Sequence, residues 1–85
     1  MQKFEYTVTD AIGIHARPAG MLVQKAKTYS STVTVSANGK TCEATRLMAL
    51  MAMCIKSGTV VSITVEGEDE LVCAAELEDF FKQNF

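Results

Sequence analysis

The side chains best suited to chemistry lie together in one short stretch, residues 13–20. It holds the only histidine of the chain, His15, its only proline, Pro18, and an arginine, Arg17. Imidazole has the ordinary side-chain pKa nearest neutrality, so it can serve as a nucleophile, a base or a ligand. Arginine stays charged, and its planar fork matches phosphate oxygens. This combination favours phosphoryl chemistry on His15.

The same stretch predicts the start of a helix. Proline is tolerated in a first turn, where its missing N–H is not needed. Pro18 could be the first helical residue with Arg17 as the cap, or lie deeper with His15 as the cap; the steric restriction on a residue before proline favours the first arrangement. In both arrangements the unpaired amides of the first turn face an anion on His15. The expected phosphate-binding residues are Ala16, Arg17 and Pro18.

Length and composition favour a single domain over residues 1–85 with a packed core, because 48% of the residues are hydrophobic. No apolar run is long enough to span a bilayer, and residues 1–10 lack a signal-peptide pattern, so we expect a cytoplasmic protein. The cysteines are odd in number, widely spaced and without a second histidine, which favours buried, reduced thiols over a metal site. They are Cys42, Cys54 and Cys73.

The net charge of −2 conceals an uneven distribution. Residues 1–56 carry seven of the eight Lys and Arg residues and three acids, whereas residues 57–85 carry one Lys and seven acids. The part that contains His15 is therefore basic, and we expect it to attract phosphate and acidic partner surfaces. A low isoelectric point and the lack of aromatics among the basic residues argue against nucleic acid as a partner.

Periodicity predicts a βαββαβα order. Alternating segments predict strands over residues 4–8, 32–36, 40–44 and 60–65, with a tight hairpin at Asn38-Gly39. Helical spacing predicts helices over residues 16–28, 47–55 and 71–83. These elements predict an α+β fold with a four-stranded, mainly antiparallel sheet and helices on one face. The expected core stripe of the first helix is Ala19, Leu22, Val23 and Ala26, and that of the last is Val72, Ala75, Leu77, Phe80 and Phe81.

Gly-Ile-His-Ala-Arg-Pro-Ala at residues 13–19 resembles the phosphorylation-site signature of HPr, the histidine-containing phosphocarrier family. Three further segments lie where that family has similar ones, so the resemblance covers nearly the whole chain. They are Asn38-Gly39-Lys40, Leu47-Met48-Ala49-Leu50-Met51 and Lys56-Ser57-Gly58.

The resemblance implies an open-faced β-sandwich with three helices on one face. It also implies that His15 and Arg17 form a catalytic pair, in which His15 takes a phosphoryl group from enzyme I and passes it to a sugar-specific enzyme IIA. Phosphoenolpyruvate would be the ultimate donor. The protein would be a cytoplasmic, monomeric carrier without a cofactor, and would meet membrane permeases only peripherally. A carrier fits the residues, because no serine or cysteine nucleophile motif, metal-ligand set, pair of carboxylates or Gly-rich nucleotide loop accompanies His15.

An apolar docking patch is expected beside His15. Met21 lies opposite the core stripe of its own helix, and the second helix is apolar on every side, so Leu50 and Met53 can face the core while a second stripe stays exposed. The alternative is that these methionines are simply core. The expected partner-binding residues are Gly20, Met21, Gln24, Leu47, Met48 and Met51.

Regulation leaves alternatives open. In many Gram-positive members of the family a serine at the start of the second helix is phosphorylated by a dedicated kinase, and the matching residue here is Arg46. Thr45 could accept phosphate instead, or could cap the helix. A regulatory relative that binds a transcription factor is the main alternative function. A small RNA-binding domain is another, although the central strands lack stacking aromatics.

Overall fold

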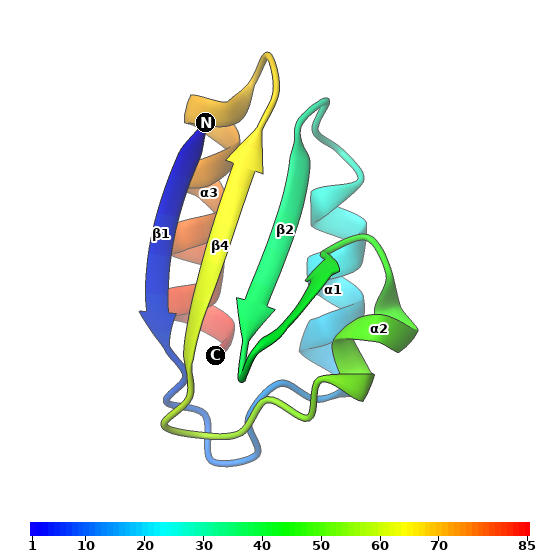
Figure 1. Cartoon of the computed structure of the whole chain (residues 1–85), viewed down its shortest axis with the longest axis vertical. Coiled ribbons are helices and arrows are strands. Elements are labelled where there is room, and N and C mark those ends of the chain that lie inside the picture. The colour runs from blue at the N-terminus through cyan, green and yellow to red at the C-terminus, as the bar shows by residue number, and fades with distance from the viewer.

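A four-stranded antiparallel sheet lies open on one face and carries helices on the other (Figure 1). The computed structural model describes residues 1–85. The strand order is β1-β4-β2-β3, and the predicted open-faced α+β architecture is confirmed. In chain order the elements are β1 (Gln2–Thr7), α1 (Ala16–Ala26), β2 (Thr32–Ala37), β3 (Lys40–Glu43), α2 (Leu47–Ala52), β4 (Val60–Glu66) and α3 (Glu70–Asn84).

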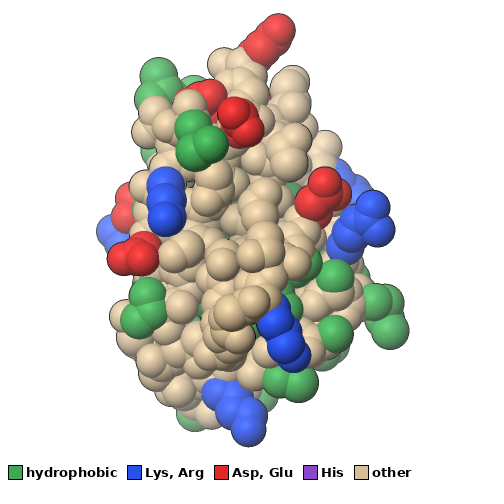
Figure 2. Space-filling model, viewed as in Figure 1, with side chains coloured by type: hydrophobic (Ala, Val, Ile, Leu, Met, Phe, Trp, Pro, Cys, Tyr) green, Lys and Arg blue, Asp and Glu red, His purple; other side chains and the backbone are tan.

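The two central strands bury one face and expose the other, as their alternating sequences predict. Val35 of β2 lies opposite Ile63 of β4, and both are fully buried under the helices. The other face of these strands carries hydroxyl side chains, and Figure 2 shows that the middle of this open face is mostly uncharged. These hydroxyl residues are Thr32, Thr34, Ser36, Ser62 and Thr64.

The hairpin between β2 and β3 forms where it is predicted. Ala37 pairs with Lys40, so the loop has only two residues. Those residues, Asn38 and Gly39, have φ angles of 54° and 77°, the left-handed conformation that a two-residue hairpin of this kind requires.

Two helices supply most of the side chains that cover the sheet. The predicted core stripe of α1 is confirmed, because all four of its residues are buried. The predicted stripe of α3 is partly wrong: Val72 and Ala75 are exposed, and the buried residues are Cys73, Leu77 and Phe81. These three recur every fourth position and so lie one above the other on a helix, whereas Val72 is turned away from them.

The second helix is shorter than predicted, because it ends at Ala52 rather than near residue 55. Leu50 and Met53 are buried, as expected. Cys54 follows with a φ of 51° and is exposed, so the expectation of a buried thiol is wrong there. Cys73 is buried, and burial raises the pKa of its thiol to about 11. None of the helices has the length and apolarity needed to cross a bilayer.

Candidate functional site

His15 is the N-cap of α1, with φ −122° and ψ 175°. Its carbonyl oxygen accepts the first helical hydrogen bond, from the amide of Ala19 at 2.9 Å. The arrangement with Arg17 as the cap, which pre-proline sterics favour, is therefore wrong. Packing outweighs that local preference, because Pro18 and Ala19 are both buried in the first turn and hold it against the core.

The amides of Ala16 and Arg17 precede that first hydrogen bond, so they have no partner within the helix. The His15 side chain makes no capping hydrogen bond either. Two N–H groups at the positive end of the helix dipole therefore lie directly after the imidazole. Pro18 has no amide hydrogen, so it fixes the start of the helix and offers an anion no donor.

The loop before His15 is held against the segment after α2. The amide of Ile14 donates to the carbonyl oxygen of Ile55 at 3.0 Å. Gly13 has a φ of 83°, and a Cβ there would lie 2.4 Å from the Ile55 oxygen and 2.8 Å from the Cα of Lys56. Only glycine both adopts this positive φ without strain and leaves room for the main chain of residues 55 and 56. The sequence marks Gly13 as a loop residue but gives no signal of the contact with residues 55 and 56.

Farther up the same loop, a second set of main-chain hydrogen bonds involves Phe85. The amides of Thr9 and Asp10 donate to the main-chain oxygen of Phe85 at 2.6 and 2.7 Å. A side-chain oxygen of Asp10 then accepts the amide of Ile12 at 2.9 Å. The Phe85 ring is buried. Sequence reasoning missed this support, because no local pattern links residues 9 and 85.

Arg17 is exposed and has no acidic partner within the chain. The two ion pairs of the structure lie elsewhere, between the Met1 amino group and Glu70 and between Arg46 and Glu43. Its guanidinium is therefore free for an anion near His15.

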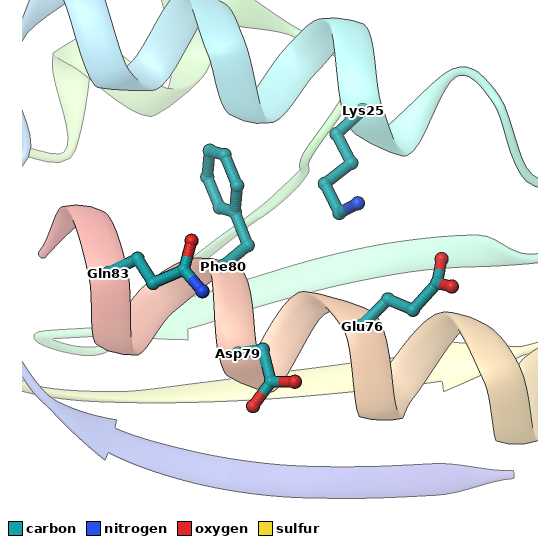
Figure 3. Close-up of a pocket in the computed structure, with 5 residues that line it drawn as sticks. All are labelled: Lys25, Glu76, Asp79, Phe80 and Gln83. Carbon is teal, nitrogen blue, oxygen red and sulfur yellow. The ribbon is translucent and has the colours of Figure 1, made fainter.

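Neither groove of the protein contains His15. One, of about 260 Å³, lies between α1 and α3, where Lys25 faces the side chains of α3 (Figure 3). The other, of about 390 Å³, lies beside the end of α1. His15 itself is partly exposed. No group of three or more His, Cys, Asp or Glu side chains is arranged to hold a metal ion. The candidate site is a surface corner that a large partner can reach.

The expected docking residues lie on two helices that pack against each other, α1 and α2. Met21, Leu47 and Met48 are exposed, with 48%, 38% and 81% of their surface accessible. Gln24 is also exposed, Gly20 is partly so, and Met51 is partly buried against the core.

Sequence reasoning missed one apolar residue of this region. Ile12 is 70% exposed in the loop that leads to His15. The available signal was an isoleucine within residues 9–13, a segment expected to form a loop.

At the start of α2, where Arg46 replaces the regulatory serine of relatives, the N-cap is not Thr45. The N-cap of α2 is Arg46, whose Nε lies 3.5 Å from a carboxylate oxygen of Glu43. Thr45 is partly buried, precedes the cap and makes no side-chain hydrogen bond. The capping role considered for Thr45 is therefore wrong.

The family profile described as "PTS HPr component phosphorylation site" matches residues 2–83 of this chain. The chain belongs to the HPr family. HPr proteins are phosphocarriers of the phosphotransferase system rather than classical enzymes. The profile covers the corner around His15 together with all four strands and nearly all of α3.

Individual relatives agree with the family assignment. The phosphocarrier protein HPr of Mycoplasma capricolum is 44% identical over 69 residues, which cover 81% of this chain and 78% of that protein. The solved structure of HPr from Thermoanaerobacter tengcongensis is 32% identical and covers 100% of this chain and 96% of its own, with a TM-score of 0.92. The catabolite repression protein Crh of Bacillus subtilis, described as a swapped dimer, covers 99% of this chain and 97% of its own at 31% identity, with a TM-score of 0.77.

Proposed function

We propose that this chain accepts a phosphoryl group from enzyme I on Nδ1 of His15 and delivers it to a histidine of a sugar-specific enzyme IIA. The observation that carries the proposal is the position of His15, which caps α1 directly before two unpaired amides and two residues before an unpaired arginine. The family assignment supplies the class of partner. The relay operates in the cytoplasm, with phosphoenolpyruvate as the ultimate donor, no cofactor and a monomeric carrier.

The transfer is a symmetric exchange between imidazoles. The lone pair on Nδ1 of His15 attacks the phosphorus, the bond from phosphorus to the donor histidine breaks, and its electron pair stays on the donor nitrogen. In the second step His15 is the donor. The chain supplies position and positive charge, which is most of what in-line phosphoryl transfer needs.

Nδ1 is the ring nitrogen nearer the main chain, so a phosphoryl group there lies close to the free amides of Ala16 and Arg17. These donors and the guanidinium of Arg17 then share the charge of the phosphoryl oxygens. A single exposed imidazole can meet two partners in turn, because neither partner needs to enter a cavity.

A regulatory role through binding a transcription factor is the second candidate. The resemblance to Crh gives it some support, since that protein is described by its part in catabolite repression. His15 and Arg17 are both accessible here, which favours transfer. The RNA-binding alternative is disfavoured because the central strands present hydroxyl side chains, not stacking rings, on the open sheet face.

Incubation with enzyme I and phosphoenolpyruvate tests the transfer. We expect the intact mass to rise by one phosphoryl group and to return to its starting value when an enzyme IIA is added. A mass that never rises would refute the carrier role. Loading without discharge to any enzyme IIA would favour the regulatory candidate.

A further inference from the structure

One lysine far along the chain touches the loop that carries His15. Gly13 packs so closely against Lys56 that an added Cβ would lie 2.8 Å from the Lys56 Cα. The adjoining hydrogen bond, from the amide of Ile14 to the oxygen of Ile55, fixes the two segments side by side. The main chain of Lys56 is therefore held beside the candidate site by contacts that do not involve its side chain.

The turn that contains Lys56 is itself anchored. The amide of Thr59 donates to the Lys56 oxygen at 3.1 Å, and the amide of Gly58 donates to the oxygen of Val8 at 2.8 Å. The Lys56 side chain is exposed, and neither ion pair of the structure includes it. Its ammonium group is thus a free cation on a fixed main chain.

We propose that Lys56 is a second phosphate-binding residue, whose ammonium contacts the phosphoryl group carried by His15. Arg17 lies two residues after His15, and the contact with Lys56 is made two residues before it. The phosphorylated imidazole would then lie between two cations that are 39 residues apart in the sequence. The inference rests on the proposed function, because it assumes that His15 is phosphorylated.

The distances allow the contact. Two residues span at most about 7 Å, so the Cα atoms of Gly13 and His15 are no farther apart than that. Lysine carries its charge on a flexible four-carbon stem with three rotatable N–H donors. It can therefore follow the phosphoryl group as the group arrives and leaves, whereas the amides of Ala16 and Arg17 are fixed.

The test compares Lys56→Gln with Lys3→Gln, which removes the same charge from an exposed position on β1. At low salt we expect Lys56→Gln to slow transfer from enzyme I by about three- to fivefold, the upper part of the range for an exposed ion pair. Lys56→Arg should restore the rate, and high salt should narrow the difference. Lys3→Gln should match the wild type.

A second measurement needs no partner during observation. With isotope-labelled lysines, the side-chain NMR signals of Lys56 should move when His15 is phosphorylated, and those of Lys3 should not. Unmoved Lys56 signals would overturn the inference even if Lys56→Gln accepted the phosphoryl group slowly from enzyme I. The lysine would then act in docking the partner. Normal transfer by Lys56→Gln would also overturn it. In both cases a wild-type chain that still becomes phosphorylated leaves the proposed function standing.

Discussion

Arg17 lies two residues after His15 with its guanidinium exposed and unpaired, so its charge contributes little to folding. A charge-assisted bond to a phosphoryl group is stronger than an ordinary surface contact. We expect Arg17→Ala to slow transfer about tenfold or more while changing the free energy of unfolding by less than about 0.5 kcal/mol. Stopped-flow or quenched transfer assays and thermal melts measure the two effects.

Lys3→Ala is the matched control for Arg17→Ala, because it also removes an exposed cation. It should leave both transfer and stability near wild type. Unchanged transfer by Arg17→Ala together with a large drop in melting temperature would assign the arginine to the fold instead of the phosphoryl group.

At the level of residues, the sequence was enough to single out His15 and Arg17 as candidate site residues. It was not enough to identify the N-cap of α1. Local sterics before Pro18 favour Arg17 at that position. The burial of Pro18 and Ala19 decides for His15 instead, and burial of a whole turn depends on partners distant in sequence. The contact between Gly13 and Lys56 was unpredictable for the same reason.

Among the elements, the loop into α1 depends most on a single residue. Gly13 combines a left-handed conformation with a main-chain contact that leaves no room for a Cβ. Gly39 shares the left-handed conformation but faces open space. The conformation alone costs a residue with a Cβ about 1–2 kcal/mol. We therefore expect Gly39→Ala to cost about that much and Gly13→Ala to cost more.

Denaturant unfolding of both variants measures this difference, and transfer assays add a functional readout. Gly13→Ala should also slow phosphorylation of His15, because the loop must move away from Ile55 to make room. Gly39→Ala should leave transfer unchanged. Equal stability losses for the two variants would show that the loop adapts easily and that the contact does not position the site.

Periodicity predicted every helix and strand of the fold but placed one helix face incorrectly. The prediction correctly included Leu77 and Phe81, which share a buried face with Cys73, but it also included the neighbouring exposed face of Val72 and Ala75. Phe4 and Tyr6 decide between them, because both rings pack edge-on against Phe81 at 5.9 Å. Such a choice depends on which strand the helix meets, and the helix sequence does not contain that information.

At the scale of the whole molecule, we expect partners to bind the end around His15, where Arg17 is exposed together with Met21 and Met48. Met48 is 81% exposed on α2, and Leu71 is 70% exposed on α3 in the acidic part of the chain. We expect Met48→Glu to speed dissociation from both enzyme I and enzyme IIA about tenfold, because interface changes act mostly on dissociation. Leu71→Glu introduces the same charge at a similar exposure and should have little effect.

Surface plasmon resonance with each partner gives the dissociation rates, and neither variant should lower the free energy of unfolding by more than about 0.5 kcal/mol. Chemical-shift mapping should find Met21 and Met48 perturbed by both partners. Perturbations confined to residues 57–85 would place the docking surface on the acidic second part of the chain instead.

The architecture was predictable because the hairpin, the strand alternation and the helix spacing all agree on one arrangement. The hydrogen bonds that support the site were not predictable, because they join residues such as Thr9 and Phe85 through main-chain atoms. Main-chain hydrogen bonds depend little on side-chain identity, so the sequence gives little sign of them.

The most direct test of the central claim is the chemistry of the modified residue. After reaction with enzyme I and phosphoenolpyruvate, the wild-type chain should carry one phosphoryl group that is lost in acid and kept in alkali, as a phosphoramidate is, and His15→Ala should carry none. A His15→Ala chain that still gains acid-labile phosphate would contradict the account, and so would a wild-type phosphoryl group that survives acid, as one on Thr45 would.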